Sequence, residues 1–350
     1  MKSAICDIIV LRGEQYMTKK YKFECKICGN KLVKNGKTSK GKQRYKCKNC
    51  NTSKIKNNGI KQRQNELKMF IKYVTDSTKK KHKTDKSRMT FYRKTNWCWE
   101  IKPTLKPPKN SSKYVFIDAT YIGRDVCFLI VKNSDFVLNF AWTDKENFYN
   151  YYELLKDIPE PEFAICDGHN GIEKACKKLW KNIDIQRCLV HVARDCERKL
   201  GKRSPCNVNQ IFRHHINRLP RLNTQRKADF WLKRFYELYE QHQEFIEEKR
   251  FRLDEFGNET KKYDRVHKNL FSATNQILSL IKKEMLFTHI GNDIPNNSNS
   301  IEGGINSPLK YLLRCHRGIS LEHQKKMFEW YLLTRSNIRI NDFIKTLIFN

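Results

Sequence analysis

The chain has 350 residues, of which 39% are hydrophobic and 12% aromatic, and its formal net charge is +33. A chain of this length can form two or three domains, and this composition excludes a fully disordered protein. No apolar run approaches the roughly 18 residues of a membrane-spanning helix, so no membrane span is predicted.

The positive charge is concentrated at one end. Residues 1–110 carry 31 basic and 7 acidic side chains (net +24), whereas the other 240 residues carry 39 and 30 (net +9). Self-repulsion of this kind destabilises a compact state unless a polyanion compensates it. Nucleic acid is the partner that this favours. An anionic membrane surface is a weaker alternative, because the basic region shows no amphipathic helix with a bulky apolar face.

The beginning of the chain predicts neither a domain nor an export signal. Residues 1–20 are expected to be disordered or an over-extended start, with Met17 as the alternative first residue. No signal peptide precedes the 13 cysteines. A cytoplasmic protein with reduced thiols and metal-bound cysteines is therefore expected in place of a disulfide framework.

Residues 21–56 predict a zinc ribbon. Two C-x-x-C pairs, Cys25 with Cys28 and Cys47 with Cys50, can complete a tetrahedral zinc site, and the segments 31–34 and 43–46 read as strands. Four thiolates leave no position for substrate, so this zinc would be structural. The alternative is four unrelated cysteines. The DNA contacts expected from the ribbon, with simple solvation as the alternative, are Arg44, Lys46 and Lys48.

Residues 57–110 predict a small helical DNA-binding segment and a linker. Leu67, Phe70 and Val74 recur at helical spacing within a helical region over 61–100. Two helices around a polar turn could form a helix-turn-helix whose second helix brings Arg88 and Arg93 to DNA. A plain helical linker is the alternative.

Residues 111–200 predict the first part of an α/β (α+β) core. Strands are expected at 114–117, 127–131, 136–142, 163–166 and 184–189, with helices at 147–156 and 171–180. This order is that of a ribonuclease H-like fold. Asp118 and Asp167 directly follow the first and fourth strands, and functional groups of α/β sheets gather at carboxyl ends of strands. We therefore predict that both are metal ligands, although a lone Asp after a strand is usually a turn former.

The remaining residues predict an all-helical insertion at 201–292 and a return to the core at 293–350. The second segment carries Glu302 between polar caps and a basic cluster, which suits a third metal ligand beside a phosphate backbone. The residues expected to hold phosphate there, with a solvated helix end as the alternative, are Arg314, His316 and Arg317.

Taken together, these segments resemble Mutator-type DDE transposases of bacterial insertion sequences, in the variant with an N-terminal zinc-binding ribbon. The motifs that carry the resemblance are CKIC, CKNC, FIDATYIG, CDGHNG, RCLVH and NSIEGGINSPLKYLLRCHRGIS. The resemblance implies that Asp118, Asp167 and Glu302 are the catalytic triad. It also matches Cys188 and His191 to the family's C-x-x-H signature, which packing of a buried Cys and a satisfied His would equally explain.

The resemblance implies metal-dependent DNA strand cleavage and strand transfer, with Mg²⁺ or Mn²⁺ at the triad and structural Zn²⁺ in the ribbon. The expected partners are double-stranded DNA, as terminal inverted repeats and target, and further copies of the chain in a homodimer or higher oligomer. The expected location is the bacterial cytoplasm, at the nucleoid. Two alternatives stay open: a transposase-derived DNA-binding regulator without catalysis, and a ribonuclease H-like nuclease or resolvase.

Overall fold

The computed structural model describes residues 24–25, 27–55, 59–77, 87–105, 107–123 and 126–349. The expected start at 1–20 and the turn of the expected helix-turn-helix, at 78–86, lie outside these residues. The chain divides into two compact units. One consists of residues up to 105 together with 309–350, and the other of residues 106–308. The segment 293–350, expected to return to the core as one piece, is thus divided at residue 308.

The first unit begins with a three-stranded antiparallel sheet. Its strands are β1 (Leu32–Lys37), β2 (Gln43–Cys47) and β3 (Ser53–Ile55), paired in the order β1-β2-β3. The first two strands lie where the sequence predicts them. Gly36 and Gly41, both with positive φ, bracket the turn between β1 and β2.

Helices make up the rest of the first unit: α1 (Gly59–Thr75), α2 (Arg88–Thr95), the 3-10 helix η2 (Asn96–Glu100), α11 (Ser307–Cys315), whose first two residues belong to the second unit, α12 (Leu321–Leu333) and α13 (Ile340–Phe349). Phe70 of α1 packs edge-on against Trp99 and Trp330, with ring centroids 4.7 and 6.0 Å away. The C-terminal helices therefore share a core with the helices of residues 59–100. None of the helices described is long and apolar enough to cross a membrane.

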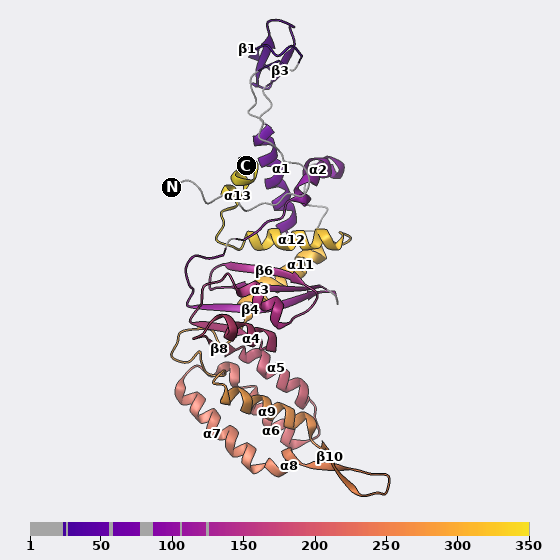
Figure 1. The fold of residues 1–350 in the computed structure, drawn as a ribbon, viewed down its shortest axis with the longest axis vertical. Helices are drawn as coiled ribbons and strands as arrows, with labels where there is room; N and C mark the ends of the chain where they lie inside the picture. The colour runs from indigo at the N-terminus through magenta and orange to yellow at the C-terminus, as the bar shows by residue number, and fades with distance from the viewer. Residues whose placement is uncertain are drawn as a thin grey trace. The chain divides into compact units, whose positions relative to one another are not determined.

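The second unit is built on a mixed five-stranded sheet (Figure 1). Its elements in chain order are β4 (Tyr114–Ile122), β5 (Val126–Lys132), β6 (Val137–Thr143), α3 (Phe148–Leu155), β7 (Phe163–Cys166), α4 (Asn170–Leu179) and β8 (Asp184–Arg187). The strand order is β6-β5-β4-β7-β8, in which β4, β7 and β8 run parallel and β5 and β6 pair antiparallel. The predicted sequence of three strands, helix, strand, helix and strand is confirmed, as is the mixed α/β class.

The two faces of the sheet bury different clusters, because successive side chains of a strand point to opposite faces. Val115 and Ile117 of β4 belong to a large core that also takes in α3, α4 and α5 (Leu189–Leu200). Phe116 belongs to a smaller cluster on the other face, with Phe163, Ile165, Ile294 and Ile301. The residue before Glu302 is therefore anchored on the face of β4 that carries Phe116.

The predicted insertion is largely helical and extends the large core. It contains α6 (Asn207–Ile216), the 3-10 helix η3 (Leu219–Arg221), α7 (Gln225–Gln241), α8 (Gln243–Glu247) and α9 (Lys268–Lys282). In Figure 1, α6, α7 and α9 lie beyond α5, on the side away from the sheet. The expectation of an all-helical segment is wrong at one point. An antiparallel hairpin of β9 (Lys249–Leu253) and β10 (Glu259–Arg265) interrupts it.

The hairpin forms because its connecting residues close a turn. The Asp254 carboxylate accepts hydrogen bonds from the main-chain N–H groups of Phe256 and Asn258, and Gly257 supplies a positive φ. Phe251 and Tyr263 then face each other across the two strands, with ring centroids 5.8 Å apart. Cross-strand aromatic pairing of this kind stabilises a strand pair and has no counterpart in a helix.

Candidate functional site

The four ribbon cysteines converge. The sulfurs of Cys25, Cys28, Cys47 and Cys50 all lie within 4.8 Å of one another, and the closest pairs are 3.3 Å (Cys25–Cys50) and 3.4 Å (Cys28–Cys47). Tetrahedral zinc with Zn–S bonds near 2.3 Å requires sulfurs about 3.8 Å apart. The donor set and its spacing therefore fit zinc. Among the described residues, these four are the only set of three or more metal-binding side chains gathered closely enough for one ion.

Hydrogen bonds within the ribbon lower the pKa of two of the four thiols in this cluster. The main-chain N–H of Asn30, together with the Cys47 thiol, lowers the pKa of Cys28 to about 6. A hydrogen bond with the Thr52 hydroxyl lowers the pKa of Cys50. Burial and the hydrogen bonds with Cys28 and Cys50 raise the pKa of Cys47 to about 11. Thiolates are the form that binds metal, so Cys28 and Cys50 are the two thiols prepared for binding, and Cys47 must lose its proton when metal binds.

The basic residues predicted to contact DNA differ in accessibility. Arg44 and Lys48 are exposed and Lys46 is half-buried. Arg44 and Lys46 share one face of β2, opposite Ile55 and Ser53 of β3. Two cationic groups on one strand face, about two residues apart, can follow a phosphate backbone.

The residues predicted to contact DNA from helices also differ in their exposure to solvent. Arg88 and Arg93 on α2 are exposed, as are Arg314 and Arg317 at the end of α11. His316, however, is only 1% exposed, and its ring packs edge-on against Tyr73, 4.9 Å between centroids. A buried ring in this packing arrangement does not present its nitrogens to a phosphate at the surface.

Asp118 does not end its strand. The prediction placed it after a strand of residues 114–117, but β4 continues to Ile122 because its whole second half pairs with β5. Only the parallel pairing of β4 with β7 ends before Asp118: its last pair is Ile117 with Cys166. Asp118 is thus 6% exposed, within a strand, on the same face as Phe116.

Asp167 follows β7 directly, as predicted, and is half-buried. Its carboxylate accepts a hydrogen bond from the main-chain N–H of His169. The Arg187 guanidinium donates to the carbonyl oxygens of Asp167 and Gly168, and a Cβ on Gly168 would lie 1.5 Å from that guanidinium. Gly168 also has a φ of 93°, which L side chains rarely adopt, so glycine is favoured at this turn of the CDG motif, a role that the sequence does not reveal.

The carboxylates of Asp118 and Asp167 influence each other. Burial, and then the charge of Asp167, raise the pKa of Asp118 to about 7. A hydrogen bond with Cys188, followed by the charges of Cys188, Asp118 and Asp167, raises the pKa of His191 to about 9 in spite of its partial burial. The protonated form of His191 is therefore favoured beside Asp118 and Asp167.

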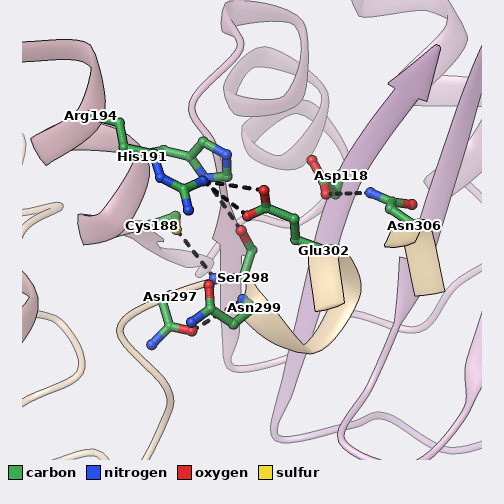
Figure 2. A network of polar contacts seen from close by, with 9 residues as sticks. All are labelled: Asp118, Cys188, His191, Arg194, Asn297, Ser298, Asn299, Glu302 and Asn306. Carbon is green, nitrogen blue, oxygen red and sulfur yellow. Dashed lines mark hydrogen bonds and ion pairs between the residues drawn. The ribbon is translucent and has the colours of Figure 1, made fainter. Parts of the chain in front are cut away.

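Glu302 begins a π-helical turn, η4 (Glu302–Asn306), which joins the short helix α10 (Asn299–Ile301) to α11. Such turns are rare and occur frequently at functional sites. Asn306, buried at 5% exposure, donates from Nδ2 to Oδ2 of Asp118 at 3.1 Å (Figure 2). This contact ties the turn that carries Glu302 to the strand that carries Asp118.

The Glu302 carboxylate is engaged by Arg194. Nη1 of Arg194 lies 3.2 Å from both carboxylate oxygens, and both side chains are partly exposed, at 57% and 41% (Figure 2). His191, on the same helix, and Cys188, at the N-cap of that helix, contact Ser298, as Figure 2 also shows. Ser298, Arg194 and Asn306 were not identified from the sequence. The only signal for Asn306 is its place four residues after Glu302.

The residues around Asp118 supply oxygen ligands of the kind that Mg²⁺ or Mn²⁺ prefers, but the carboxylates of Asp118, Asp167 and Glu302 are not gathered closely enough to share one ion in this arrangement, in which Glu302 is paired with Arg194. Carboxylate and amide oxygens are the ligands such ions prefer. The Oδ1 atom of Asn306 is buried beside Asp118 and has no hydrogen-bond partner, so an oxygen ligand remains there. A cation would also offset the burial and the Asp167 charge that together raise the pKa of Asp118.

These features define a two-part protein: a four-cysteine metal-binding ribbon, and a mixed α/β unit with a buried acidic centre on its sheet. Residues 137–302 match the model of the Mutator family of transposases. The resemblance is thereby confirmed over these residues, which are similar to the transposase domain of the Mutator family. The matched segment contains Asp167, Cys188, His191 and Glu302, whereas Asp118 and the ribbon lie outside it. No curated protein matches the chain.

Proposed function

We propose that this protein is a DNA transposase that binds the ends of its mobile element and catalyses metal-dependent strand cleavage and strand transfer. The match of residues 137–302 to Mutator-family transposases carries the proposal. The order β6-β5-β4-β7-β8 supports a ribonuclease H-like core, in which Asp118 lies on β4 and Asp167 directly follows the neighbouring strand β7.

In this proposal the side chains of Asp118, Asp167 and Glu302 would hold two divalent ions. Bound there, the ions would supply activation of a water or 3′-hydroxyl and stabilisation of the leaving oxygen. Asp118 must be ionised to bind metal, and Asn306 fixes the orientation of its carboxylate. Arg187 holds the turn after β7, so that Asp167 keeps its place beside Asp118.

DNA recognition in this proposal rests on the basic N-terminal region. The ribbon with Arg44, Lys46 and Lys48, the α2 residues Arg88 and Arg93, and Arg314 and Arg317 after α11 are exposed or half-buried cations suited to phosphate. Since two element ends must be brought together, the active complex contains at least two copies of the chain. Action on chromosomal DNA places it at the nucleoid of the bacterial cytoplasm.

The test is a cleavage assay with the full-length protein and DNA that bears the inverted repeats flanking its gene. With Mg²⁺ or Mn²⁺ we expect cut strands with 3′-hydroxyl ends and products joined to target DNA. DNA that is bound but never cut would identify the regulator. Cutting without any joined product would identify the nuclease or resolvase.

Binding should depend steeply on salt. Changing Arg44, Lys46 and Lys48 together to Gln should reduce the slope of log affinity against log salt by up to about 3, since each phosphate neutralised contributes about 0.9. Fluorescence anisotropy of labelled end DNA measures this slope. The matched control changes three exposed lysines of the second unit to Gln: Lys174, Lys178 and Lys181. Equal flattening by both triple variants would contradict a specific role for the ribbon.

A further inference from the structure

Three residues, spaced three apart, lie at the start of α5 and at its N-cap. Cys188 is the N-cap of α5, and His191 and Arg194 follow at intervals of three, so each lies next to the one before it along the helix. Each of them contacts the segment 298–302, which lies more than 100 residues further along the chain.

The contacts are specific and polar. The Cys188 sulfur accepts a hydrogen bond from the main-chain N–H of Ser298 at 3.2 Å, and Nδ1 of His191 lies 3.4 Å from the Ser298 hydroxyl (Figure 2). Arg194 holds the Glu302 carboxylate. Next to them, the main-chain N–H of Leu189 donates to the carbonyl oxygen of Asn296 at 2.9 Å.

We propose that Cys188, His191 and Arg194, here called the α5 clamp, position Glu302 for metal binding with Asp118 and Asp167. The proposal rests on the proposed function and adds a role for the C-x-x-H motif. The clamp residues are positioning residues: they act on the segment that carries Glu302 and need no contact with metal or DNA.

The chain connectivity explains why such a clamp is needed. The residues between α5 and Asn296 leave the sheet to form α6–α9 and the hairpin, so Glu302 cannot be fixed by its neighbours in sequence. The helix α5 directly follows β8 and contributes Leu189, Val192 and Cys196 to the large core. It is therefore a rigid support from which the returning segment can be held.

The contacts that the clamp residues make differ in strength. Cys188 and Ser298 are both fully buried, so the hydrogen bond between them satisfies a main-chain donor that would otherwise be left unpaired. The Arg194–Glu302 pair is half-exposed, and exposed ion pairs are weak. Glu302 can therefore exchange Arg194 for a divalent ion, while Cys188 and His191 keep its backbone in place. At the other end of the turn, Asn306 supplies the second anchor, on Asp118.

The experiment measures Mn²⁺ affinity of the full-length protein by electron paramagnetic resonance of the free ion. Cys188→Ala should weaken binding about tenfold, the lower end of what loss of a residue that supports a metal ligand costs. Cys188→Ser should restore most of the affinity, because a hydroxyl also accepts from the Ser298 N–H. In a Glu302→Ala background, Cys188→Ala should cause no further loss, because the clamp acts through Glu302.

The matched control is Cys196→Ala. Cys196 lies on the same helix and is also buried, but its sulfur faces the Ala273 carbonyl in the insertion. This variant should bind Mn²⁺ like the wild type. If Cys188→Ala fails to fold, as judged by thermal unfolding, the half-buried His191 changed to Gln provides the same comparison.

Two results would overturn the proposal in distinguishable ways. If Glu302→Ala weakens Mn²⁺ binding but Cys188→Ala and His191→Gln do not, the clamp alone is wrong. The same holds if Cys188→Ala weakens binding equally in the Glu302→Ala background. If Asp118→Ala and Glu302→Ala both bind Mn²⁺ like the wild type, the proposed active site fails, and the clamp with it.

Discussion

Changing Asp118 to Asn should abolish strand cleavage and strand transfer while leaving binding to element ends intact. Asparagine keeps the shape of the side chain but removes the charge that holds the ions. Loss of several kcal/mol of charge stabilisation corresponds to a rate decrease on the order of 10³-fold or more. The rate of single-turnover cleavage of labelled end DNA measures the effect, with anisotropy on the same DNA as the binding measurement.

The matched control is Asp135→Asn. Asp135 is an exposed aspartate in the turn between β5 and β6, and its substitution should leave cleavage unchanged. If Asp118→Asn retains wild-type cleavage, the assignment of Asp118 to the catalytic site is wrong.

The same variant has an expected effect on stability without added divalent ions. The pKa of Asp118 is raised from 3.8 to about 7, so between these values the folded protein keeps a proton that the unfolded chain has lost. Stability therefore falls as the pH rises through this window, and the full cost is present above pH 7. Asparagine carries no such cost. Asp118→Asn should melt at a higher temperature than the wild type at pH 8, and the difference should shrink towards pH 4.

Changing Cys47 to Ser should unfold the ribbon. Its sulfur is fully buried within the four-cysteine cluster, and a structural zinc site supplies about 10–16 kcal/mol of apparent binding free energy to ribbons of this size. We expect zinc content to fall from one ion per chain to near zero, and affinity for end DNA to fall with it. The second unit should keep its fold, because its core contains none of these cysteines.

Zinc content by atomic absorption and DNA binding by anisotropy check this prediction. The control is Cys206→Ser, a half-buried cysteine before α6 that belongs to no metal-binding group among the described residues. It should retain both zinc and DNA binding. A Cys47→Ser protein that still holds one zinc would refute the four-cysteine site.

Features that depend on near neighbours along the chain could be predicted from the residues alone. Two C-x-x-C pairs predicted the ribbon, because each pair needs only one tight turn. The order of strands and helices in residues 114–187 followed from local hydrophobic patterns. Asp167 was correctly placed after β7 for the same reason, and the family resemblance rested on motifs of this local kind.

Features that depend on partners distant in sequence became visible only in the folded chain. β4 runs past Asp118 because β5 pairs with it along its whole second half, and His316 is buried because Tyr73 packs against it. The contacts of Ser298, Glu302 and Asn306 join residues 107 to 188 positions apart. No local propensity encodes such contacts. They form only when the sheet, α5 and the returning segment bury their apolar faces together, which brings polar groups within hydrogen-bonding distance.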